Sequence, residues 1–99
     1  MAMKKQNYIS ITTFSEHHKV SDSFIFSLID LQLIEIKEIN AVKYIPESQL
    51  SALEKFVNLY NDLAINSEGI DVIQHLLQRI QLMKQEIGQL KRRLELYES

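Results

Sequence analysis

The sequence predicts a mainly α-helical protein in which a helix-turn-helix head with a short β-hairpin precedes one long C-terminal coiled-coil helix. Three observations support this fold class. The 99 residues include two glycines and one proline, so few positions interrupt a helix. Period-two patterning surrounds Asn40, and an unbroken heptad pattern fills the end of the chain. A chain of this length supports one small domain and one extra element.

The first two helices of the head are predicted to be short. Thr12 or Thr13 offers an N-cap hydroxyl for a helix that ends near Lys19. Glu16 follows Thr13 by three residues, as in a capping box. The pair 21–22 then provides a tight turn and a second N-cap. Apolar residues at helical spacing follow that turn: Phe24, Ile25, Leu28, Ile29, Leu31 and Leu33.

A β-hairpin is predicted where the hydrophobic period changes to two. Ile34 and Ile36 alternate with charged residues before Asn40, and Val42 and Tyr44 continue the alternation after it. A helix-turn-helix followed by a hairpin is the outline of a winged helix, with the hairpin as the wing. The sequence therefore predicts a winged helix-turn-helix head.

Two further helices are predicted after the hairpin. Pro46 has its φ angle pre-set for a first helical turn, and Glu47 suits a helix N-terminus. One apolar face of this third helix is formed by Leu50, Leu53, Phe56, Val57, Tyr60 and Leu63. Asn66 and Ser67 then cap a fourth helix, in whose first turn Gly69 is tolerated. We expect a head over residues 8–65 and a dimerisation helix over 66–98.

The fourth helix carries the strongest periodicity of the chain. Its a and d positions are all apolar: Ile73, Leu76, Ile80, Met83, Ile87, Leu90, Leu94 and Tyr97. A helix of about 30 residues spans roughly 45 Å, which is longer than the small head can cover. The residues expected to pair with a second subunit, in parallel or antiparallel orientation, are Ile80, Met83, Ile87, Leu90, Leu94 and Tyr97. In the alternative, the helix folds back and Ile70, Leu77 and Leu82 complete a monomeric core.

Composition and motifs argue against an enzyme. There is no cysteine, no glycine-rich loop and no nucleophile motif. His17, His18 and His75 contain no i,i+4 pair, so no metal site is expected, and neither is a cofactor. Glu35 and Glu38 fall on the predicted hairpin, where a solvated surface is the default. No stretch reaches the roughly 18 apolar residues of a membrane span, and no signal-length run follows the start, so we expect a cytoplasmic protein.

Charge argues against DNA binding by the head. The whole chain has 11 basic and 13 acidic residues and a formal net charge of −2. No lysine or arginine lies between Lys19 and Lys37, although a recognition helix needs such donors. Residues 1–46 balance five lysines against five acidic residues, namely Lys4, Lys5, Lys19, Lys37 and Lys43 against Glu16, Asp22, Asp30, Glu35 and Glu38. A neutral head is poorly suited to holding a polyanion.

The predicted second helix has more apolar residues than one face can bury. Phe24, Ile25 and Phe26 are consecutive, and three consecutive side chains cannot all point inward from a helix. Phe24 or Phe26 is therefore a candidate anchor for a protein partner. In the alternative, neighbouring helices or the wing cover all three.

The order and spacing of five motifs resemble the CbpM family of chaperone modulators, which is built like the MerR-type winged-helix regulators. The resemblance covers nearly all of residues 8–97. The motifs are Tyr8-Ile9-Ser10-Ile11-Thr12-Thr13-Phe14, Val20-Ser21, Leu33-Ile34-Glu35, Ala64-Ile65-Asn66-Ser67-Glu68-Gly69-Ile70 and Leu90-Lys91-Arg92-Arg93-Leu94.

The resemblance implies a regulator that binds the J-domain of a DnaJ-like co-chaperone and restrains its action on the heat-shock chaperone. J-domains present a basic helix, so an acidic surface with an aromatic anchor is complementary to them. The candidate partner-binding residues are Phe24, Phe26, Asp30, Glu35 and Glu38, with Glu54 and Asp62 as further acidic candidates. The alternative is a MerR-type transcriptional regulator that touches DNA phosphates through Lys19, Lys37 and Lys43. MerR regulators usually place arginine in the second helix and the wing, and this sequence has none there.

Overall fold

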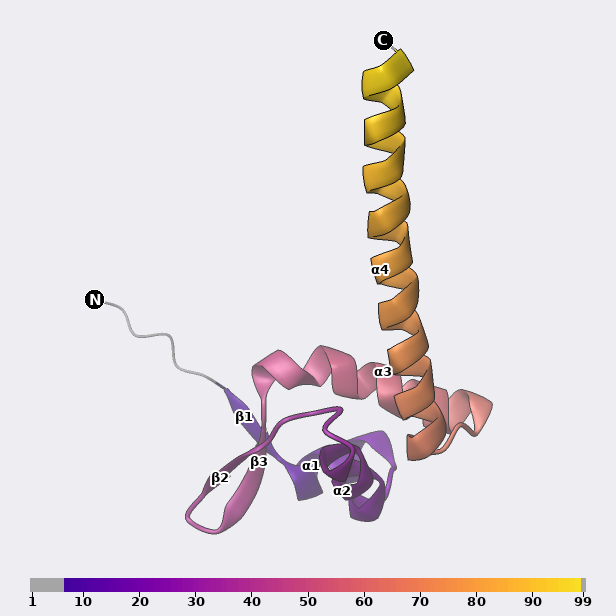
Figure 1. Cartoon of the computed structure of the whole chain (residues 1–99). Coiled ribbons are helices and arrows are strands. Elements are labelled where there is room, and N and C mark those ends of the chain that lie inside the picture. Colours follow the sequence, from indigo (N-terminus) through magenta and orange to yellow (C-terminus); the bar gives the residue numbers. More distant parts are fainter. Residues whose placement is uncertain (1–6, 99) are drawn as a thin grey trace, which may run out of the picture.

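A computed structural model describes residues 7–98 and shows a small head from which one long helix projects (Figure 1). The elements in chain order are β1 (Tyr8–Ser10), α1 (Ile11–His18), α2 (Asp22–Asp30), β2 (Lys37–Ile39), β3 (Val42–Pro46), α3 (Glu47–Leu63) and α4 (Ser67–Glu98). The fold is mainly helical, with a winged helix-turn-helix head followed by the long helix α4, as the sequence predicts.

The helix-turn-helix is set by two serine caps. Ser10 accepts a hydrogen bond from the backbone amide of Thr13 at 3.2 Å, so α1 begins earlier than predicted and the capping box with Glu16 does not form. Ser10 is the last residue of β1, and its extended backbone already has the N-cap conformation. Lys19 ends α1 in the left-handed conformation. Ser21 caps α2 through the amide of Phe24, also at 3.2 Å, as predicted.

The wing is a hairpin in a three-stranded antiparallel sheet of order β1-β3-β2. Asn40 and Ala41 form its turn, and both have positive φ angles, of 50° and 65°. Such a two-residue turn matches the twist of the strands. The period-two pattern begins at Ile34, but β2 begins only at Lys37. Ile34 is buried in the core and is not part of the sheet. Pro46 ends β3 and caps α3, one position before the predicted first turn.

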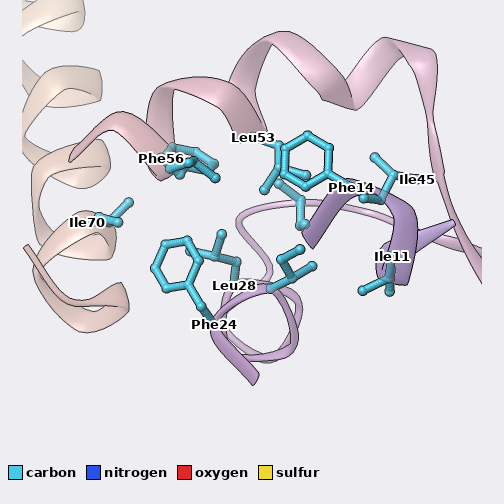
Figure 2. Packing of buried hydrophobic residues seen from close by; sticks show 11 residues of the cluster. Ile11, Phe14, Phe24, Leu28, Ile45, Leu53, Phe56 and Ile70 are labelled. Atoms are coloured by element: carbon cyan, nitrogen blue, oxygen red, sulfur yellow. The ribbon is translucent and has the colours of Figure 1, made fainter. Parts of the chain in front are cut away.

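The core joins α1, α2, β3, α3 and the first turn of α4 (Figure 2). Its buried apolar residues are Ile11, Phe14, Phe24, Ile25, Leu28, Ile34, Ile45, Leu53, Phe56, Val57 and Ile70. Phe24 is 6% exposed, and its ring lies 4.4 Å from that of Tyr60, so the prediction that Phe24 is an exposed anchor is wrong. Phe24, Ile25 and Leu28 fall on one side of α2, and packing against α3 and α4 turns that side inward.

The helix α4 contacts the head through its first turns only. Asn66 caps it by accepting a hydrogen bond from the Gly69 amide at 2.8 Å. A Cβ atom at Gly69 would meet the Ile65 side chain at 2.9 Å, which explains why glycine fits this closely packed turn. Ile70 is fully buried, whereas Leu77 and Leu82 are exposed, so the helix does not fold back along the head. Within residues 7–98, no helix is both long and apolar enough to cross a membrane.

Candidate functional site

The outer face of α2 carries one exposed aromatic residue between two acidic ones. Asp22, Phe26 and Asp30 recur every four residues, so their side chains lie on the same side of the helix. Both aspartates are exposed, and Phe26 is 38% exposed. In a helix-turn-helix, the second helix is the recognition helix, and α2 has that position here. Its outer face presents an apolar ring with a negative charge at either end.

The wing and α1 complete a shallow hollow beside this face. The hollow has a volume of about 280 Å³. Its lining residues are Ser10, Ile11, Thr12, Asp22, Phe26, Ala41, Val42 and Lys43. We call the hollow, together with Asp30 and Glu38, the α2–wing surface. It brings residues from β1, α1, α2 and the hairpin together, which no single sequence motif could indicate.

Lys43 is the residue through which the wing reaches α2. Its ammonium nitrogen Nζ lies 5.0 Å from the centre of the Phe26 ring, which is within the range of a cation–π interaction. Glu38 pairs with Lys43 across the hairpin, so the two side chains project from the same side of the sheet. The positive charge at this surface therefore lies over an aromatic ring and has one acidic neighbour across the hairpin.

The lysines that a DNA-binding head would use do not form one stripe. Lys37 pairs with Tyr44 and Lys43 with Glu38, so alternation along the strands places the two lysines on opposite faces of the hairpin. Lys37 instead lies 5.8 Å from the ring of Tyr8. Lys19 stands apart, at the end of α1. Lys4 and Lys5 lie outside the described residues. The charge pattern of the head is thus mixed across its described surface.

The predicted partner-binding residues are only partly brought together. Phe26 lines the hollow, Asp30 lies one turn further along α2, and Glu38 faces Lys43. The backbone amide of Glu35 donates a hydrogen bond to the Gln49 side chain of α3, and Glu35 does not line the hollow.

The partner-binding candidates from the sequence omitted the two other charged residues of the α2–wing surface, Asp22 and Lys43. Asp22 could have been found there, because it precedes Phe26 by one helical turn. Lys43 could not, because its contact with Phe26 depends on how the hairpin packs against α2.

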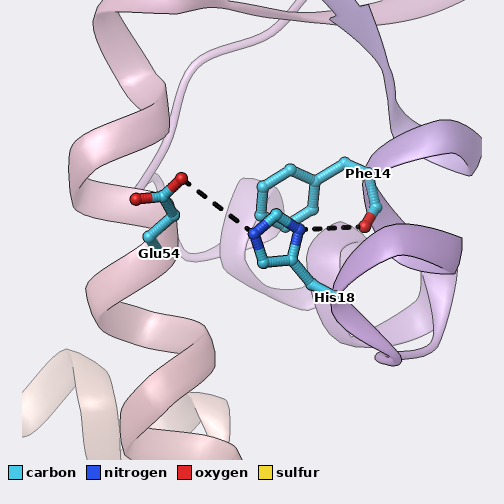
Figure 3. A network of polar contacts seen from close by, with 3 residues as sticks. All are labelled: Phe14, His18 and Glu54. Carbon is cyan, nitrogen blue, oxygen red and sulfur yellow. Dashed lines mark hydrogen bonds and ion pairs between the residues drawn. The ribbon is translucent and has the colours of Figure 1, made fainter.

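One of the three histidines has a structural role in the head (Figure 3). The His18 ring stacks on the buried Phe14 ring at 3.9 Å, and its Nδ1 lies 3.3 Å from the Phe14 carbonyl oxygen, to which it can donate. Its Nε2 lies 4.0 Å from the Glu54 carboxylate, so His18 links α1 to α3. In the part of the chain that is described, no group of three His, Cys, Asp or Glu side chains is placed to hold a metal ion.

A second candidate surface is the apolar seam of α4. The six residues expected at a subunit contact are each between 47% and 89% exposed: Ile80, Met83, Ile87, Leu90, Leu94 and Tyr97. Figure 1 shows this part of the helix standing clear of the head. A continuous row of exposed apolar side chains is typical of interaction sites, so this seam is a candidate for one.

The fold and these surfaces define a winged helix-turn-helix binding protein with an extended C-terminal helix. A protein-family model described as MerR HTH family regulatory protein matches residues 9–92. The match includes the head and most of α4, so the chain belongs to the MerR helix-turn-helix regulatory family. No curated protein sequence and no solved structure gives a significant match. The MerR-like part of the predicted resemblance is therefore confirmed, and the assignment to the chaperone modulators stays a prediction.

Proposed function

We propose that this protein is a chaperone modulator that binds the J-domain of a DnaJ-like co-chaperone. The observation that carries the proposal is the outer face of α2, where Asp22 and Asp30 flank the exposed Phe26 ring. A basic helix of the J-domain complements this face in charge, and the aromatic ring supplies an apolar anchor. Bound there, the J-domain helix is sterically prevented from meeting the chaperone, so the function is inhibitory and non-catalytic.

The same face argues against the DNA-binding alternative. Phosphate contacts dominate the affinity of proteins for DNA and come mainly from lysine, arginine and helix N-termini. A recognition helix with two exposed aspartates and no basic residue repels the backbone it would have to approach. The wing lysines Lys37 and Lys43 point to opposite faces, so they cannot engage one phosphate strand together.

We also propose that the protein is a homodimer through the α4 seam and acts in the cytoplasm. The seam is apolar at each a and d position from Ile73 to Tyr97, and isoleucine at a with leucine at d favours two-stranded pairing. A dimer carries two α2–wing surfaces, so each dimer can bind two co-chaperone molecules.

Calorimetric titration with a purified cytosolic J-domain protein tests the proposal. Asp22→Asn combined with Asp30→Asn removes both acidic neighbours of Phe26. We expect J-domain affinity to fall roughly 2- to 30-fold, since exposed charge pairs contribute about 0.2–1 kcal/mol each. The matched control combines Glu68→Gln with Glu95→Gln, which removes two exposed charges near the two ends of α4.

The same kind of binding experiment can also favour the DNA-binding alternative over the chaperone-modulator proposal. Absence of J-domain binding together with salt-sensitive retardation of duplex DNA assigns the protein to the DNA-binding members of its family. A J-domain affinity that the control pair lowers as much as the Asp22 and Asp30 pair contradicts the α2–wing surface as the binding site.

A further inference from the structure

The exposed Phe26 ring already holds a cation that belongs to the same chain. Lys43 Nζ lies 5.0 Å from the ring centre, and Phe26 keeps 38% of its surface exposed. An aromatic face attracts a lysine or arginine side chain, because the face of the ring carries the negative end of its quadrupole. The contact shows that the ring is accessible to a cation in this surface.

The Lys43 ammonium group is weakly held. Glu38 faces it across the hairpin and Asp22 lines the same hollow, yet within residues 7–98 Lys43 makes no ion pair of 4.0 Å or less. The wing segment that carries it is itself exposed at Val42 and Lys43. A side chain with one weak aromatic contact and a free path to solvent is readily displaced.

We propose that Phe26 is the acceptor for an arginine or lysine side chain of the partner, and that Lys43 occupies this acceptor in the unbound protein. The inference rests on the proposed function and names the chemistry of its recognition step. The partner's cation lies over the Phe26 ring between Asp22 and Asp30. The displaced Lys43 side chain turns toward Glu38, its neighbour across the hairpin.

Lys43 thereby sets the affinity for basic partners. Its contact with Phe26 must be lost before the partner's cation can bind, and its charge repels that cation. The sign of this effect separates a protein partner from DNA, because a lysine beside a phosphate backbone strengthens binding. Neutralising Lys43 should therefore tighten the binding of a cationic helix and weaken any binding of DNA.

The test compares two lysines of the same wing. Lys43→Gln removes the charge over Phe26, and Lys37→Gln removes an equal charge that lies 5.8 Å from Tyr8 on the other face of the hairpin. Both variants are titrated with a purified J-domain protein and with a synthetic, lysine- and arginine-rich helical peptide. Each is also prepared with Phe26→Leu, which keeps the apolar bulk and removes the aromatic face. Far-ultraviolet circular dichroism confirms that every variant is folded.

We expect Lys43→Gln to bind both probes about two- to five-fold more tightly than the unmodified protein. Lys37→Gln should give less than half of that gain, and the gain of Lys43→Gln should disappear in the Phe26→Leu background. The inference is overturned by unchanged or weaker binding of Lys43→Gln, by an equal gain in Lys37→Gln, or by a gain that persists without the aromatic ring.

The two probes separate the inference from the proposed function. If the basic peptide shows the expected pattern and the J-domain protein does not bind, the acceptor assignment stands and the proposed function fails. If the J-domain protein binds without the Lys43 effect, the proposed function stands and the acceptor assignment fails. If neither probe binds, both are wrong.

Discussion

The head and the helix α4 contain the same kinds of apolar residue in opposite surroundings. Ile25 and Leu28 in the head are completely buried, whereas Ile87 and Leu90 in α4 are about half exposed, at 51% and 56%. The head elements cross over one another and cover each other's apolar faces, while α4 beyond its first turns projects from the head as a single rod (Figure 1). The head is thus stabilised from within the chain, whereas the seam of α4 stays exposed and is a candidate for contact with a second surface.

The largest effect is expected in the head core. Leu53 in α3 is fully buried in the cluster of Figure 2, so Leu53→Ala removes packing and leaves a cavity. We expect a loss of about 2–5 kcal/mol in the free energy of unfolding by urea denaturation. Leu63→Ala, at a position of the same helix that is 65% exposed, should cost much less. Equal losses for the two variants contradict the core described here.

Breaking the seam should change assembly and leave the head folded. Ile87→Asp combined with Leu90→Asp places four carboxylates in the proposed dimer interface, where they are desolvated without partners. Sedimentation equilibrium should give the mass of one chain instead of two. Gln78→Asp with Gln85→Asp adds the same charge on the opposite side of α4 and should leave the dimer intact. A mass that does not respond to the seam variant leaves the coiled-coil proposal without support.

The junction between the two regions depends on the Asn66 cap. Its side chain accepts a hydrogen bond from the Gly69 amide in the first turn of α4, so Asn66→Ala leaves that donor without its protein acceptor. We expect a loss of about 1 kcal/mol, read from thermal or urea unfolding. Asn58→Ala, at an exposed position inside α3, provides the comparison and should be neutral or slightly stabilising. An equal loss at Asn58 rules out capping as the cause.

The smallest effect is expected at the tip of the wing, where a substitution should increase the stability of the protein. Ala41 has a φ of 65°, a left-handed conformation that disfavours a residue with a Cβ atom. Ala41→Gly should raise the free energy of unfolding by roughly 0.5 kcal/mol, since the relieved strain exceeds the added entropy of the unfolded chain. Ala52→Gly inside α3 should instead destabilise the protein by about 1 kcal/mol. A destabilising Ala41→Gly contradicts the turn geometry.

Local rules were sufficient for most of the fold. Ser21 and Asn66 cap helices and Asn40 forms the hairpin turn, each at the position that the sequence predicts. Caps and tight turns depend on only a few neighbouring residues. The sequence predicts Thr12 or Thr13 as the N-cap of α1, but the N-cap is Ser10. Ser10 owes its extended backbone to pairing with β3, and local sequence patterns carry no information about that pairing. The helical spacing of apolar residues continues to Leu33, but α2 ends at Asp30, since Gln32 turns the chain with a φ of 60°.

By itself, the sequence determined the helical fold class, the hairpin and the heptad row of α4, because these follow from spacing along one segment. Tertiary structure decided which of three consecutive apolar residues in α2 is exposed, since the rotation of that helix depends on the elements packed against it. It buried Phe24 and Ile25 and left Phe26 outside. Tertiary structure also placed Lys43 over the Phe26 ring, a contact between residues 17 positions apart that depends on how the wing packs beside α2.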